Sequence, residues 1–104
     1  MKVAITGHLS GLGKELYTRI PNSVGFDKGS HHDIKDPDPW IESLLSCDVF
    51  INNAYDGFHQ VNMLEKVFLK WMNENKTIIN ISSTASEIKH LSLIHISEPT
   101  RRLI

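Results

Sequence analysis

The residues of this chain that could do chemistry begin with a glycine-rich turn. The segment TGHLSGLG, residues 6–13, follows a short apolar run and precedes a stretch with helical periodicity. Gly7 and Gly11 would let the backbone turn tightly and approach a pyrophosphate, and Gly13 would let the helix pack closely on the strand. Backbone N–H groups at a helix N-terminus attract anions. The turn residues expected to surround a phosphate are Thr6, Gly7, His8, Ser10, Gly11, Leu12 and Gly13.

An acidic residue follows the turn at a suggestive distance. Asp27 ends the second apolar run, residues 23–27, about twenty residues after Gly7. A carboxylate at this place can accept hydrogen bonds from both hydroxyls of an adenosine ribose, and it would repel a 2′-phosphate. The sequence therefore favours NAD over NADP as cofactor. Lys28 leaves NADP open, because a neighbouring cation could hold the additional phosphate.

The segments that must position these residues alternate between strand and helix patterns. Short apolar runs rich in β-branched residues predict buried parallel strands, and apolar residues three or four apart predict amphipathic helices. Strands joined by helices form a parallel sheet with helices on both faces, so the predicted fold class is α/β. The predicted strands are 2–6, 23–27, a short one at 32–34, 48–52 and 77–82, and the predicted helices are 11–20, 36–46 and 58–75.

Several apolar residues are expected to pack in the core rather than to serve a site. Cys47 leads into the strand 48–52, and a buried cysteine usually behaves as a small hydrophobe. Trp40 and Trp71 occupy amphipathic helical positions, which also indicates packing. The predicted apolar face of the longest helix consists of Val61, Leu64, Val67, Phe68 and Trp71.

Composition excludes several classes of protein. The 104 residues predict one domain, and the net charge of −1 gives no basic surface for nucleic acid. One cysteine allows no internal disulfide, and no apolar run approaches the ~20 residues of a membrane span. The chain starts directly on a strand pattern without a signal peptide, so a cytoplasmic protein with no membrane partner is expected. His31 and His32 would point to opposite faces of a strand, and we expect no metal site there.

Four motifs in this order resemble the short-chain dehydrogenase/reductase family. The first is the spacing Thr-Gly-x-x-x-Gly-x-Gly of residues 6–13. Asn52, Asn53, Ala54 and Tyr55 resemble the family's Asn-Asn-Ala-Gly, with tyrosine in place of glycine. INISS, residues 79–83, resembles the strand end that carries the catalytic serine, here Ser83, with Ile81 beside the cofactor. HDI, residues 32–34, resembles the short strand that binds adenine through Asp33, with Ile34 beside the ring.

The resemblance implies a Rossmann-like doubly wound parallel sheet that is truncated after about five strands. Its expected strand order is 32–34, 23–27, 2–6, 48–52, 77–82, which leaves the last strand as an uncovered edge. The implied cofactor is NAD, with NADP not excluded, lying over the carboxyl ends of the strands. The implied reaction is hydride transfer between the nicotinamide and a small-molecule carbonyl or alcohol substrate. The full-length parent protein would be a homo-oligomer.

The chain departs from the family where the acid–base pair should appear. The family's Tyr-x-x-x-Lys should start about thirteen residues after Ser83, but the tyrosines of this chain are Tyr17 and Tyr55. Asn62 lies on the helix that carries the family's relay asparagine, yet its position does not match securely. We therefore expect this chain to be inactive. A non-catalytic dinucleotide-binding or sensing protein is the alternative, and the glycine spacing argues against a sugar-nucleotide epimerase.

The last residues are expected to come from a source other than the gene. LSLIHISEPTR, residues 91–101, can be back-translated into a transposase-derived adapter of sequencing libraries, read in frame. We expect residues 91–104 to be such an artefact and residues 1–90 to be the N-terminal part of the nucleotide-binding domain. A divergent natural C-terminus is the alternative.

Overall fold

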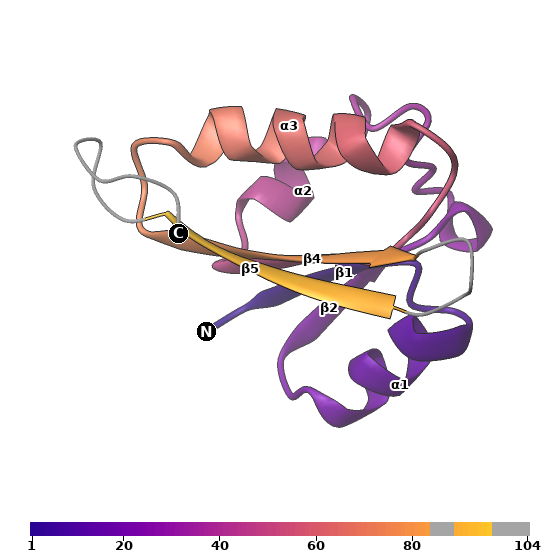
Figure 1. The fold of residues 1–104 in the computed structure, drawn as a ribbon. Helices are drawn as coiled ribbons and strands as arrows, with labels where there is room; N and C mark the ends of the chain where they lie inside the picture. Colours follow the sequence, from indigo (N-terminus) through magenta and orange to yellow (C-terminus); the bar gives the residue numbers. More distant parts are fainter. Residues whose placement is uncertain (84–88, 97–104) are drawn as a thin grey trace.

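The computed structural model describes residues 1–83 and 89–96, with side chains described as far as Ile81. Four strands form a parallel sheet in the order β2-β1-β3-β4, and β5 joins the β4 edge in the antiparallel direction. The fold is therefore α/β (Figure 1). The strands are β1 (Val3–Thr6), β2 (Ser23–Phe26), β3 (Val49–Asn52), β4 (Lys76–Ser83) and β5 (Lys89–Ile96), and the helices are α1 (Gly11–Arg19), the 3-10 turn η1 (Lys28–Ser30), α2 (Ile41–Leu45) and α3 (His59–Trp71).

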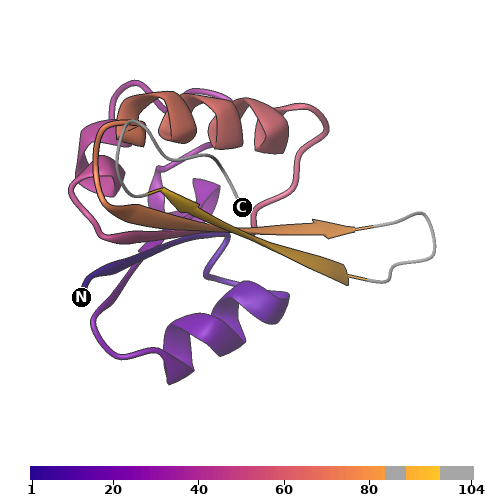
Figure 2. The ribbon, with the colours of Figure 1, turned by 60° about the vertical axis from the view of Figure 1, so that its left-hand side comes forward.

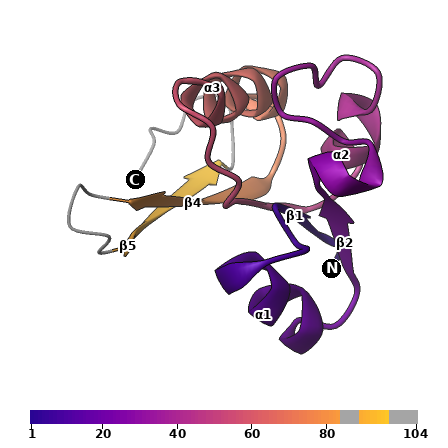
Figure 3. The ribbon, with the colours of Figure 1, turned by 90° about the vertical axis from the view of Figure 1, so that its right-hand side faces the viewer.

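The α-helices cover both faces of the sheet. Seen nearly end-on, α1 lies below the strands, and α2 and α3 lie above them (Figure 3). The central strands β1 and β3 therefore bury side chains in both directions, which is why their sequences, VAIT and VFIN, are apolar up to the last residue. Within the residues that the structure describes, no helix has the length and apolar character needed to cross a bilayer.

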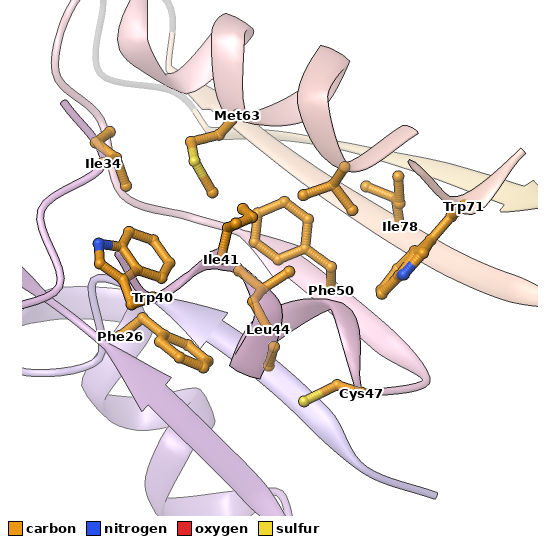
Figure 4. Close-up of a cluster of buried hydrophobic side chains, with 12 residues drawn as sticks. Phe26, Ile34, Trp40, Ile41, Leu44, Cys47, Phe50, Met63, Trp71 and Ile78 are labelled. Atoms are coloured by element: carbon orange, nitrogen blue, oxygen red, sulfur yellow. The ribbon is translucent and has the colours of Figure 1, made fainter. Parts of the chain in front are cut away.

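Two cores result from the alternation of side chains along the strands. On the α1 side, Leu16 and Ile20 pack against five buried strand residues, among them Ile81. On the other side, Phe26 stacks on Trp40 with 5.3 Å between ring centroids (Figure 4). Cys47 is fully buried there, as the sequence predicted. The buried members of this larger core are Ala4, Phe26, Ile34, Trp40, Ile41, Leu44, Cys47, Phe50, Met63, Val67, Trp71 and Ile78.

The strands end at different depths along one edge of the sheet. The β3–β4 ladder stops at the pair Asn52 and Asn80, but β4 continues to Ser83. Figure 2 shows β4 and β5 reaching past the other strands. The carboxyl ends of β1, β2 and β3 therefore lie at one level, and β4 extends beyond them.

The predicted order of the four parallel strands is confirmed, but the short strand at 32–34 is wrong. There the Asp33 carboxylate accepts a hydrogen bond from Lys35 N at 2.9 Å, and its carbonyl accepts one from Asp36 N at 3.0 Å. This local bonding bends the chain into a turn in place of an extended strand. Within residues 1–83 and 89–96, the parallel sheet thus has four strands and not five.

Three further expectations need correction. The helix predicted over 36–46 begins only at Ile41. On α3, Val67 and Trp71 are buried as predicted, and Leu64 and Phe68 pack partly buried against the core. Val61 was wrongly predicted to be on this face, because it is 58% exposed, and Gln60 and Met63 are buried in addition. The edge of β4 is not uncovered, because β5 pairs with it from Lys76–Ile96 to Ser83–Lys89.

Candidate functional site

A cleft of about 500 Å³ lies at the carboxyl ends of β1, β2 and β3. Three segments line it: the turn between β1 and α1, the chain that follows β2, and the loop that follows β3. Its lining residues are Gly7, Ser10, Gly11, Leu12, Phe26, Asp27, Lys28, His32, Asp33, Ile34, Lys35, Asn53, Ala54, Tyr55 and Asp56. Ten of the predicted cofactor-binding residues are in this set: Gly7, Ser10, Gly11, Leu12, Asp27, Asp33, Ile34, Asn53, Ala54 and Tyr55.

The turn between β1 and α1 needs its glycines for different reasons. Gly7 and Gly11 have φ angles of +74° and +56°, which L side chains rarely adopt. A Cβ on Gly13 would stand 1.9 Å from the Gly7 carbonyl oxygen, so only glycine permits α1 to approach β1 this closely. A Cβ on Gly11 would meet no described atom within 4 Å, so its backbone opens toward free space at the cleft.

The first turn of α1 points a positive dipole end at this space. Ser10 is the N-cap residue, in extended conformation, and its side chain makes no capping hydrogen bond within the described helix. The first turn contains Lys14 and no acidic residue among its described positions. The partial positive charge of the helix end is therefore available to an anion.

The ends of β1 and β3 are joined by side-chain hydrogen bonds. Thr6 Oγ1 accepts from Asn53 N at 3.0 Å and from Ala54 N at 3.2 Å. Asn53 Nδ2 donates to the carbonyls of Thr6 and Gly7 at 3.1 and 3.3 Å. The Asn-Asn-Ala segment is thus held against the glycine turn. Thr6 acts behind the cleft and not as part of its lining.

Asp27 lies where the sequence placed it, at the end of β2 and in the cleft. Its Oδ2 accepts from Gly29 N at 2.8 Å and caps the short turn η1 together with Ser30. The carboxylate is only partly buried and stands beside Lys28 and His32 in the lining. A carboxylate has more acceptor sites than this one bond uses.

An ion pair links two rims of the cleft. Lys35 Nζ lies 3.3 Å from Asp56 Oδ2, and the two residues belong to the segments after β2 and after β3. Both side chains are about half exposed, so the pair contributes little to stability. The sequence motifs did not single out either residue, because neither lies within the matching positions.

Five predicted cofactor-binding residues do not line the cleft. Thr6 and Gly13 support the turn from behind, Asn52 is fully buried under α3, and Ile81 is a core residue. His8 is 8% exposed and packs against Gly25, where an added Cβ would stand 2.1 Å from its ring. Ser83 ends β4 by backbone pairing with Lys89, and its side chain lies outside the described residues.

Sequence reasoning missed a buried polar residue, Gln60. Its side chain is 6% exposed and donates to the carbonyls of Asn52 and Ile81. The signal was present: Gln60, Met63, Val67 and Trp71 are spaced as one helical face. A polar residue on an otherwise apolar face indicates a buried hydrogen-bonding role.

Two groups at the opposite end of the sheet have shifted pKa values. Burial raises the pKa of the Cys47 thiol. The backbone N–H of Lys2 donates to Asp48 Oδ2 at 2.8 Å and lowers the pKa of that carboxyl. Both groups precede β3, so they have structural effects and are remote from the cleft.

Comparison of the chain with models of protein families, with curated proteins and with solved structures found no match. Among residues 1–83 and 89–96, no group of three or more His, Cys, Asp or Glu side chains is placed to hold a metal ion. The cleft is therefore the feature from which a function can be inferred.

Proposed function

We propose that this chain binds a nicotinamide dinucleotide in the cleft, as the N-terminal part of an NAD(P)-dependent short-chain oxidoreductase with a Rossmann-like doubly wound sheet. One observation carries the proposal. The glycine turn, the acid after β2, and Asn53 and Ala54 after β3 line the same recess, although they are far apart in the sequence. The recess lies between β1 and β3, whose following helices cover opposite faces, and such switch points are where open α/β sheets bind ligands.

The residues present fit the cofactor's pyrophosphate. Gly11 leaves open space that a side chain would fill, and the uncapped start of α1 faces it. A diphosphate over this turn would interact with backbone N–H groups and the helix dipole without a metal ligand set.

The adenosine end of the cofactor would lie toward β2. Asp27 can accept from ribose hydroxyls while it keeps its bond to Gly29, and its charge would oppose a 2′-phosphate. Asp33 and Ile34 line the same end and are proposed to contact the adenine. NAD is therefore the proposed cofactor. NADP is the alternative, because the Lys28 cation could hold its additional phosphate.

The proposed chemistry of the parent enzyme is hydride transfer between nicotinamide and a carbonyl or alcohol, with Ser83 orienting the substrate oxygen. The cofactor supplies the hydride, and the protein supplies position and a proton. Tyr17 and Tyr55 are followed four residues later by Pro21 and His59, so neither forms a Tyr-x-x-x-Lys pair. This chain is therefore proposed to bind cofactor without turnover, which also suits the second candidate, a non-catalytic dinucleotide-binding protein.

Binding can be tested by titrating the purified chain with NADH, NADPH and ADP and following nucleotide fluorescence or heat. NADH is expected to bind more tightly than NADPH. The Asp27→Asn variant keeps an oxygen for the Gly29 bond but removes the charge. It should therefore reduce the difference between the affinities for NADH and NADPH. Asp36→Asn, an exposed residue outside the cleft lining, is the matched control. The proposal fails if none of the three nucleotides binds.

The origin of residues 91–104 remains part of the proposal. The backbone of residues 91–96 belongs to β5, and regular structure of this kind is compatible with either origin. The source DNA decides between them: the adapter's codons should run unbroken from codon 91. Synonymous codons that scatter away from the adapter would refute the artefact and favour a natural C-terminus.

A further inference from the structure

Gln60 stands where three elements meet behind the cleft. It is the second residue of α3, and it lies over the carboxyl ends of β3 and β4. Gln60 Nε2 donates to the Asn52 carbonyl at 3.0 Å and also to the Ile81 carbonyl. Because both partners are acceptors, the amide must present its NH₂ group to them, which fixes its orientation.

The bonds of Asn52 complete a reciprocal arrangement. Asn52 Nδ2 donates to the Gln60 carbonyl at 3.0 Å and to Asn80 Oδ1 at 2.8 Å. Gln60 and Asn52 therefore each bind the other's main chain through a side-chain amide. We call this set, the Gln60 amide with the carbonyls of Asn52 and Ile81, the Gln60 clamp.

The register of the sheet explains why the clamp is needed. The parallel ladder ends at Asn52 and Asn80, so the Ile81 carbonyl lies beyond the last residue of β3. A buried carbonyl without a donor costs free energy comparable to a lost hydrogen bond. Gln60 is almost fully buried and replaces the missing strand at this point. It thereby ties the end of β3 to the continuing β4.

The clamp acts on the parts of the site that lie away from β2. Asn52 is followed directly by Asn53, Ala54 and Tyr55, which line the cleft, and Ile81 precedes the strand end that carries Ser83. With the adenosine end over β2 and the pyrophosphate at β1, the nicotinamide end of a dinucleotide would extend toward β3 and β4.

We infer that Gln60 is a positioning residue that sets the nicotinamide half of the cleft, an inference that rests on the proposed function. It touches neither ligand nor reacting atoms. It holds the two strand ends at the spacing that the nicotinamide half needs. Without its amide, these strand ends are displaced in part of the population, and the apparent affinity is the intrinsic affinity multiplied by the fraction of molecules that remain competent to bind.

The test compares NADH with ADP in Gln60→Met, a variant of similar size that donates no hydrogen bond. NADH affinity should fall about tenfold, since one or two buried carbonyls lose their donor. ADP, which reaches only the turn and the β2 side, should bind within about twofold of the unmodified chain. Gln60→Asn, with a shorter amide arm, gives the same comparison if Gln60→Met does not fold.

Met63→Ala is the matched control, because Met63 is fully buried one turn along the same helix and packs in the core outside the clamp. It should lower the midpoint of unfolding, and any change in affinity should be the same for NADH and for ADP. Equal losses for NADH and ADP in the Gln60 variant, or no loss at all, would overturn the inference.

Amide hydrogen exchange in the ligand-free protein separates this inference from the proposed function. Residues 53–56 and 81–83 should exchange faster in Gln60→Met, while residues 3–13 should keep their protection. Unchanged protection at 53–56 refutes the clamp even where NADH binds. Failure of the unmodified chain to bind NADH or ADP refutes the proposed function instead, and with it the role of the clamp in nicotinamide binding.

Discussion

Replacement of Gly13 by alanine tests the close approach of α1 to β1, on which the turn depends. An added Cβ would stand 1.9 Å from the Gly7 carbonyl oxygen and 2.5 Å from Asn53 Nδ2. The carbonyl belongs to the backbone at the end of β1, and the Asn53 amide is held by the carbonyls of Thr6 and Gly7. Neither neighbour can move without breaking bonds of the site.

Two opposing effects decide the outcome of Gly13→Ala. In an unobstructed helix, alanine is favoured over glycine by about 1 kcal/mol. Overpacking costs about 1–3 kcal/mol, and the upper end applies here because the nearest atom is backbone. The net loss is about 2 kcal/mol, which in a domain of this size lowers Tm by about 8–16 °C.

Thermal and urea unfolding followed by circular dichroism measure this loss, and an NADH titration should show weaker binding at temperatures where the variant is folded. Lys14→Ala, at the next and exposed position of α1, is the control and should change Tm little. Equal or higher stability of Gly13→Ala would mean that helix propensity dominates. In that event the packing of α1 on β1 described above is wrong.

Two predictions concern the groups with shifted pKa values. The pKa of Asp48 is lowered, so its contribution to folding stability is present at neutral pH and is lost as the pH falls below about 4. In Asp48→Asn, the urea midpoint of unfolding should therefore fall less steeply between neutral and acidic pH. An unchanged pH dependence of the midpoint would contradict this. Cys47 is fully buried and its pKa is raised, so a thiol reagent should label it only as fast as the protein opens, and labelling at the rate of a free thiol would disprove its burial.

The residues that line the cleft were easier to predict from the sequence than the residues that hold them in place. Glycines, an acid at a strand end and a polar segment after an apolar strand carry their information in local sequence, and the structure brings most of them into one cleft. The helical spacing of Gln60 with the buried residues of α3 indicates that it is buried, but local sequence does not indicate what it binds. Its partners are carbonyls that lack a strand partner because β4 extends beyond the last residue of β3. The relative lengths and register of these strands are properties of the assembled sheet.

Local chemistry also explains the misplaced elements. Asp33 bonds to the backbone of Lys35, and this side-chain turn competes successfully with extended structure. Asp36 and Asp38 each precede a proline, which disfavours helical geometry, so α2 cannot begin before that stretch ends. Both outcomes were available from the sequence, since aspartate and proline act on their immediate neighbours.

On the α3 side of the sheet, the side chains of β3 and β4 change from apolar to polar toward the carboxyl ends of the strands, next to the cleft. Phe50 and Ile78 pair in register and are fully buried in the core, and the next inward pair is Asn52 and Asn80. An apolar pair at that level would leave the Gln60 carbonyl without the donor that Asn52 Nδ2 supplies. The side chains of Asn52 and Gln60 therefore satisfy backbone carbonyls where β3 ends, directly before Asn53 and Ala54, which line the cleft proposed for the dinucleotide.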